Sequence, residues 1–172
     1  MKRFHLVFLL ISAMLLMMTT PSRGQGDDKK TLVFQLPDTY KWTSDSFEDG
    51  DLWGVHYKGF IGDERYPSVD FQQVSMLNQL VEMGIPKLAK QIGALIKSYD
   101  DTAKLQLRKK DKIDGDNCHF YTITTAKTTL LLFYRQSNEV THSVEMELHA
   151  DQLEQITLAM WEKLFFSSLL SD

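Results

Sequence analysis

Residues 105–148 read LQLRKKDKIDGDNCHFYTITTAKTTLLLFYRQSNEVTHSVEMEL, and this stretch decides the fold of the chain. Four segments within or overlapping it have the composition or the alternation of β-strands: residues 104–110, 118–125, 130–134 and 140–148. Only short turns separate them, with Asp114-Gly115 as the clearest hairpin signal. Connections this short join antiparallel neighbours. The sequence therefore predicts an antiparallel four-strand meander in the C-terminal half.

The two last segments differ in how they alternate. Residues 130–134, Leu-Leu-Leu-Phe-Tyr, are apolar on both faces, which predicts an inner strand covered on two sides. Residues 140–148 alternate apolar and polar side chains along their length. That alternation predicts a strand with one face in water.

Helical patterns precede the meander. Asp70 has the features of an N-cap, with Gln73 three residues later as in a capping box, and apolar residues then follow at helical spacing until Gly84. Pro86 can begin a second helical segment that runs to Tyr99. Whether the chain turns a corner or kinks between these two segments is left open.

A last helix is predicted after the meander, because Asp151 and Glu154 form another capping pair ahead of an apolar stripe. Strands are also predicted at residues 31–36 and 52–61. The predicted fold class is therefore α+β: an antiparallel sheet with a C-terminal four-strand meander, covered by amphipathic helices as an α/β/α sandwich.

The first 24 residues have the pattern of a secretory signal peptide. Lys2 and Arg3 precede an apolar run over residues 4–18, and small residues follow up to Gly24. The run is shorter than the roughly 18 apolar residues that span a membrane. We expect cleavage after Gly24, a secreted or periplasmic protein, and no stable membrane insertion after cleavage. No cysteine follows the run, so no lipid anchor is expected.

The expected organisation is a signal peptide at 1–24, a flexible lead-in at 25–30 and a single α+β domain at 31–172. Cleavage leaves 148 of the 172 residues, enough for one core. It removes three cations and no acid, so the net charge of −4 becomes −7, which argues against nucleic acid as a partner.

Cys118 is the only cysteine, so no internal disulfide can form. A buried thiol is expected, and an exposed one that pairs two chains in a homodimer is the alternative.

No motif has catalytic or metal-binding spacing. The acidic loop around Asp114 lacks the oxygen spacing of a calcium loop, and the histidines form no zinc motif. No nucleophile elbow, phosphate loop or dinucleotide fingerprint is present. The sequence predicts no enzyme, no cofactor and no metal. The basic run at residues 108–112 is interpreted as a charged strand end that discourages edge pairing, with anion binding as the weaker alternative.

Aromatic residues near turns in the first half form the one candidate surface for a ligand or partner: Tyr40, Trp42, Trp53 and Tyr66. Aromatic rings in such places can line a ligand cleft, but they also fill cores, and the core is the favoured interpretation.

Three short motifs carry a resemblance. They are FQLPDTYKW at residues 34–42, IDGDNCHFY at 113–121 and the closing Phe165-Phe166-Ser167. With the order of elements, they resemble the PsbP-like superfamily, which includes the DcrB-like envelope proteins. Pro86 departs from that group, which typically has one unbroken helix there. The resemblance implies a non-catalytic accessory role and carries over no catalytic residues.

The leading hypothesis is a secreted or periplasmic, non-catalytic accessory protein that binds an unknown protein or small molecule. One alternative is a small envelope hydrolase, which needs two carboxylates, or a histidine and a nucleophile, converging in a cleft. The other is a self-assembling structural module that uses the last helix or a sheet edge.

Overall fold

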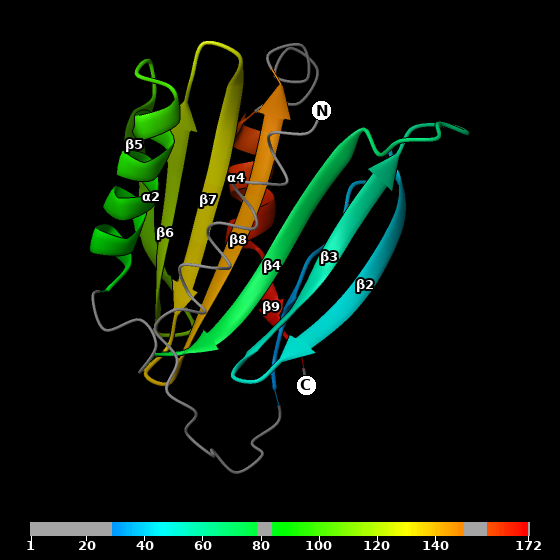
Figure 1. Cartoon of the computed structure of the whole chain (residues 1–172). Helices are drawn as coiled ribbons and strands as arrows, with labels where there is room; N and C mark the ends of the chain where they lie inside the picture. Colours follow the sequence, from blue (N-terminus) through cyan, green and yellow to red (C-terminus); the bar gives the residue numbers. More distant parts are fainter. Residues whose placement is uncertain (1–28, 79–83, 150–157, 172) are drawn as a thin grey trace.

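The computed structural model describes residues 29–78, 84–149 and 158–171, in the arrangement of Figure 1. The strands are β1 (Leu32–Val33), β2 (Lys41–Asp49), β3 (Leu52–Phe60), β4 (Val69–Leu77), β5 (Lys104–Ile113), β6 (Asp116–Thr124), β7 (Thr128–Gln136), β8 (Val140–His149) and β9 (Leu169–Leu170), and the helices are α2 (Ile85–Tyr99) and α4 (Leu158–Phe166). The predicted signal peptide and the capping pair of Asp151 and Glu154 lie outside the described residues.

One seven-stranded sheet dominates the described structure, in the order β2-β3-β4-β8-β7-β6-β5, with β1 and β9 as a separate two-stranded ribbon. Every neighbouring pair in the large sheet is antiparallel. The strands β5 to β8 follow one another across the sheet, in the order expected of the C-terminal meander. Six antiparallel steps separate the edge strands β2 and β5, so these two strands run in the same direction (Figure 1).

The predicted fold class is wrong. Of the described residues, 53% are in strands and 19% in helices, which is a mostly β protein and not an α+β sandwich covered by amphipathic helices. The largest error lies after Asp70, where the predicted helix is strand β4. Its side chains alternate between more and less buried, and β4 forms ladders with β3 on one side and β8 on the other. Pairing on both sides outweighs the capping signals, which act only on the local backbone.

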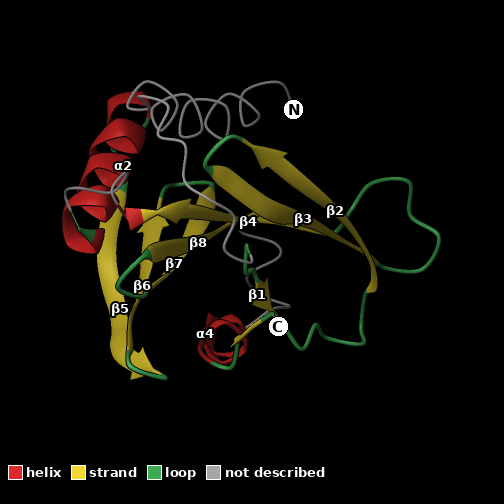
Figure 2. Cartoon of the chain, turned by 90° about the horizontal axis from the view of Figure 1, so that it is seen from below, coloured by secondary structure: helices red, strands yellow, loops and turns green. Residues whose placement is uncertain are grey.

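The two described helices lie on opposite faces of the sheet (Figure 2). Helix α2, with Pro86 in its first turn, packs Ala89 and Ile92 onto the side chains of β6 and β7. We call the sheet surface on this side the α2 face. Helix α4 packs Trp161 and Phe165 on the other side, the α4 face, where β1 also lies. The ring of Phe165 stacks on Phe133 with centroids 5.6 Å apart.

Strand β8 differs from its prediction on one face. Its polar side chains Ser143 and Glu145 were expected in water, and both are buried. The opposite side chains, including Val144 and Met146, belong to the core under α4, as their apolar character indicates. Both faces of β8 are therefore shielded, which fits its place near the middle of the seven strands.

Candidate functional site

The four aromatic residues predicted as a ligand surface differ in burial: two are buried, one is half-buried and one is exposed in a loop. Tyr40 and Trp53 are buried, and the Trp53 Nε1 donates a hydrogen bond of 2.7 Å to the carbonyl of Lys30. Trp42 is half-buried and packs against Tyr40 with ring centroids 5.4 Å apart. Tyr66 is 65% exposed in the connection between β3 and β4. Tyr40 and Trp42 thus meet, while Trp53 lies toward the other end of the β2–β3 hairpin. A ligand surface built on these rings stays a prediction.

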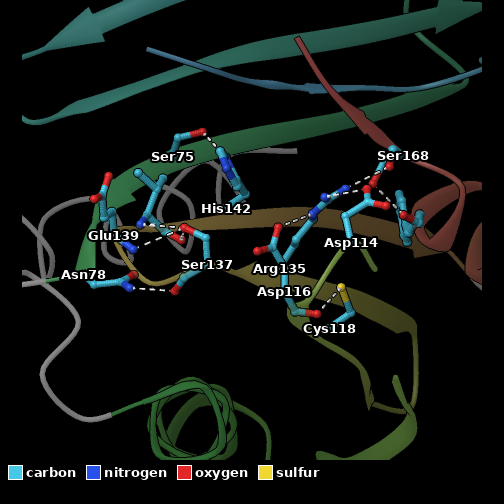
Figure 3. Close-up of polar contacts among 12 residues, drawn as sticks. Ser75, Asn78, Asp114, Asp116, Cys118, Arg135, Ser137, Glu139, His142 and Ser168 are labelled. Atoms are coloured by element: carbon cyan, nitrogen blue, oxygen red, sulfur yellow. Dashed lines mark hydrogen bonds and ion pairs between the residues drawn. The ribbon is translucent and has the colours of Figure 1, made fainter. Parts of the chain in front are cut away.

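The structure instead gathers buried polar side chains at one end of the sheet (Figure 3). Arg135 on β7 stands at its centre with a side chain that is 1% exposed. Its Nε donates to Asp116 Oδ2 at 2.8 Å, its Nη2 to Asp114 Oδ2 at 3.1 Å, and its Nη1 to the carbonyl of Ser168 at 3.0 Å. We call these four residues the Arg135 cluster.

Local sequence explains how the Arg135 cluster forms. Asp114 and Gly115 make the turn between β5 and β6, and both have positive φ, 52° and 92°. An Asp-Gly pair tolerates that conformation better than most residues, so the turn places the carboxylates of Asp114 and Asp116 at one end of the sheet. Antiparallel pairing sets Cys118 of β6 opposite Arg135, which brings the guanidinium to the turn. The cluster thereby connects the β5–β6 hairpin, β7 and the chain after α4.

A second buried polar group adjoins this cluster. His142 on β8 lies directly opposite Arg135 in the ladder. Its Nδ1 lies 2.7 Å from the Ser75 hydroxyl on β4, and Gln73 Nε2 donates to that hydroxyl at 2.6 Å. Burial and the nearby Arg135 guanidinium lower the pKa of His142 to about 4. At neutral pH His142 is therefore uncharged.

The pair of Ser75 and His142 is the closest approach to a catalytic arrangement that we find among the described residues. A serine hydroxyl beside an imidazole can act as a nucleophile and base if the base readily accepts a proton. Here the hydroxyl is fully buried, and a base with a pKa near 4 beside a guanidinium is far from the neutral value that suits proton transfer. The pair is suited to joining β4 and β8 through side chains.

Cys118 is buried on β6, which confirms the expectation of a shielded thiol. Burial, the largest effect, raises its pKa to about 11, although Arg135 acts in the opposite direction. Thiolate is the reactive form of cysteine, so this sulfur is poorly nucleophilic at neutral pH. His119 projects from the opposite face of the strand.

Two acidic side chains on the α2 face of β8 are also perturbed. Burial raises the pKa of Glu145 to about 7, and burial raises the pKa of Glu147 as well. The charge of Glu145 contributes to a raised pKa of the buried Tyr134, after burial itself. Within the described ranges, no three His, Cys, Asp or Glu side chains are placed to hold a metal ion.

The exposed charge is concentrated on the edge strand β5. Five cationic side chains, defined here as the β5 basic edge, are Lys104, Arg108, Lys109, Lys110 and Lys112. Lys109 lies 3.8 Å from Glu162 of α4 and above the ring of Phe166. For the other four, no carboxylate within 4.0 Å is found in the described part of the chain. Strand β5 also carries Asp111, so the edge keeps a net positive charge that ion pairs in the described structure do not neutralise.

Sequence reasoning missed the Arg135 cluster and its histidine neighbour. A signal was present, because Arg135 directly continues an apolar run on an inner strand and His142 occupies an apolar face. A charged residue in such a place requires partners. Asp114 and Asp116, at the turn that the Asp114-Gly115 signal predicts, supply these partners in the structure.

No protein-family model matches the chain, and no curated protein matches it significantly. The resemblance to the PsbP-like superfamily therefore stays a prediction. Neither helix in the described ranges has the length and apolar character needed to cross a membrane.

Proposed function

We propose that this chain is an exported, non-catalytic binding protein that receives an acidic, extended polypeptide segment along β5. The observation that carries the proposal is the β5 basic edge: a ten-residue strand at the end of the sheet with four cations that lack carboxylate partners in the described structure. Export is supported by the pattern of residues 1–24, and a non-catalytic role by the burial and low basicity of the Ser75–His142 pair.

An edge strand favours a polypeptide over other anions. Its outward backbone N–H and C=O groups form a row that another extended chain can pair with, as in strand addition. Lysines on such an edge oppose pairing with neutral or basic strands, and they favour an acidic one. The 49% exposed Leu107 offers an apolar contact beside the charges. The segment best fitted to this edge therefore alternates acidic and apolar residues.

The ladder of β5 also limits where the segment can pair. The register with β6 shifts between Leu107 and Lys109, so β5 has a bulge around Arg108. A bulge interrupts regular pairing. The regular stretch after it, residues 109–113, contains Lys110 and Lys112 and is where we expect the segment to bind.

Fluorescence anisotropy with a labelled peptide of about eight alternating valine and glutamate residues tests this function. We expect saturable binding that weakens as salt is raised, because exposed charges are screened. The triple substitution Arg108→Glu, Lys110→Glu and Lys112→Glu should weaken binding at least about tenfold, since like charges then face each other. A peptide of alternating valine and lysine should not bind.

The matched control is Lys87→Glu, Lys90→Glu and Lys97→Glu on exposed positions of α2, which changes the net charge by the same amount. It should retain most of the binding. Equal loss in the two variants would show a general charge effect and contradict a site on β5.

A further inference from the structure

We propose that the acidic strand received by the β5 basic edge is β2 of a second copy of this chain, so that copies join edge to edge into one continued sheet. This inference rests on the proposed function and names the partner of the same site. It uses the two open edges of the seven-stranded sheet, which Figure 1 shows at opposite sides of the molecule.

The two edges carry opposite charge. Strand β2 has Asp45, Glu48 and Asp49, with one cation at its start. All three acids are exposed. Asp45 and Glu48 have lysine neighbours, and the Asp45–Lys58 pair is long, 3.9 Å, with 78% of the Asp45 side chain exposed. Such solvent-exposed pairs are weak and can exchange partners readily. The carboxylates in the C-terminal half of β2 are therefore available to pair with the cations of the β5 basic edge.

The direction of the strands brings the two charged halves together. Strands β2 and β5 run the same way, and in each most of the charge lies in the C-terminal half, acidic at residues 45–49 and mainly basic at residues 108–112. A second copy shifted along the sheet without rotation would set its β2 parallel to β5 of the first. Acidic residues would then lie beside basic ones, and the helix layers would stay on their own sides of the sheet.

The faces of the charged side chains also match. The cross-strand registers place Asp45 and Asp49 on the α2 face. Lys110 and Lys112 project from the same face, since Lys110 pairs with His119. Side chains that meet across a ladder must share a face. On the α2 face the charges are therefore complementary in sign and in position along the strand, whereas Glu48 projects from the α4 face.

Pairing of like edges is opposed by the same charges. Two β5 strands would set lysines against lysines, and two β2 strands would set acids against acids, which destabilises a ladder. Only the unlike edges attract. A contact between unlike surfaces leaves a free edge at each end of the pair, so repeated addition gives an open chain unless rotation closes a ring.

Two variants separate the edges in sedimentation velocity. The basic-edge variant is Arg108→Glu, Lys110→Glu and Lys112→Glu, and the acidic-edge variant is Asp45→Lys, Glu48→Lys and Asp49→Lys. The unmodified protein should form larger species as concentration rises, and salt should reverse this. Each variant alone should stay monomeric. An equimolar mixture should associate again, because the variants are complementary at both edges: the unmodified β2 meets the unmodified β5, and the substituted β5 meets the substituted β2. Its apparent Kd should be at least about tenfold lower than that of either variant alone.

A chain that carries all six substitutions has the charges exchanged between its edges, and it should associate again. Circular dichroism should show that every variant is folded. The inference is overturned if the unmodified protein stays monomeric at all concentrations, if association survives both single-edge variants, or if the mixture of the two variants does not associate. Should the acidic peptide still bind β5 in those cases, the proposed function stands and only the second copy as partner is wrong. If peptide binding is lost as well, both the proposed function and the second copy as partner are wrong.

Discussion

Arg135 and Arg108 stand on strands of the same meander, and their surroundings are opposite. Arg135 is 1% exposed and donates three hydrogen bonds to two carboxylates and a carbonyl. Arg108 lies in the bulge of an edge strand, exposed, with a 3.4 Å contact to Gln106. A guanidinium removed from water must have its donors satisfied inside the fold, whereas one in water can remain free for a partner.

The comparison separates structural charge from charge available for binding. The Arg135 cluster ties together three parts of the chain that are distant in sequence, and the burial of Arg135 leaves its guanidinium little access to a partner. The β5 basic edge holds little of the fold together, because its cations lack internal partners apart from Lys109. Substitutions in the cluster should therefore change stability, and substitutions on the edge should change binding.

The largest effect is expected from Arg135→Met, which preserves much of the volume but removes every donor. Breaking a buried ion pair by deleting one partner typically costs about 3–5 kcal/mol, because the other partner stays buried without compensation. Urea unfolding should show that loss. Arg108→Met is the control and should change stability by less than about 0.5 kcal/mol. A similar small change in both variants would mean that the Arg135 cluster does not stabilise the fold.

The next effect is a dependence on pH that comes from His142. Its pKa falls from 6.5 to about 4 on folding, so between these values the unfolded chain binds a proton that the folded chain does not. The stability that the neutral His142 contributes is complete above about pH 6.5 and is lost as pH falls toward 4. That difference corresponds to about 3 kcal/mol. His142→Gln should therefore flatten the stability profile over this range in urea unfolding.

His149→Gln on the same strand is the control, because His149 is exposed. This variant should keep the loss of stability toward pH 4 that His142 causes. An unchanged acid dependence in His142→Gln would mean that this imidazole is not held neutral by its surroundings.

A smaller effect on stability is expected within the Arg135 cluster, where Asp116 and Asp114 bind the same guanidinium but differ in their exposure to solvent. The side chain of Asp116 is 14% exposed and that of Asp114 is 75% exposed. Hydrogen bonds to charged groups contribute about 1.5–3 kcal/mol when shielded and much less in water. Asp116→Asn should lower the free energy of unfolding by about 2 kcal/mol and Asp114→Asn by less than about 1 kcal/mol. The reverse order would show that burial does not govern these contacts.

The same contrast explains what the sequence could predict. The strands from β5 to β8 were predictable because each turn is short and each strand has its own local pattern, down to the Asp114-Gly115 hairpin. Strand β4 was not, because residues 69–77 have capping signals and apolar spacing that also suit a helix. What decides its conformation is the ladder with β8, about seventy residues later in the chain, and no local window contains that information.

The polar groups also differ in how far the sequence could predict them. The β5 basic edge was visible as a charged run, although its meaning depended on β5 being the last strand of the sheet. The Ser75–His142 contact joins β4 to β8, so a chain predicted to be helical near Ser75 could not reveal it. The burial of Glu145 was missed for a related reason, because a strand with alternating apolar and polar residues was assumed to have its polar face in water.

The smallest expected change in stability is that of the basic-edge variant, Arg108→Glu, Lys110→Glu and Lys112→Glu. These side chains are exposed and have no carboxylate partner in the described structure, so the three substitutions together should change stability by no more than about 0.5 kcal/mol. Peptide binding should nevertheless be lost. Urea unfolding and anisotropy on the same preparation measure both quantities. If stability and binding fell together, the contrast between a structural cluster and a binding edge would be wrong, because β5 would then hold the fold in the way that Arg135 does.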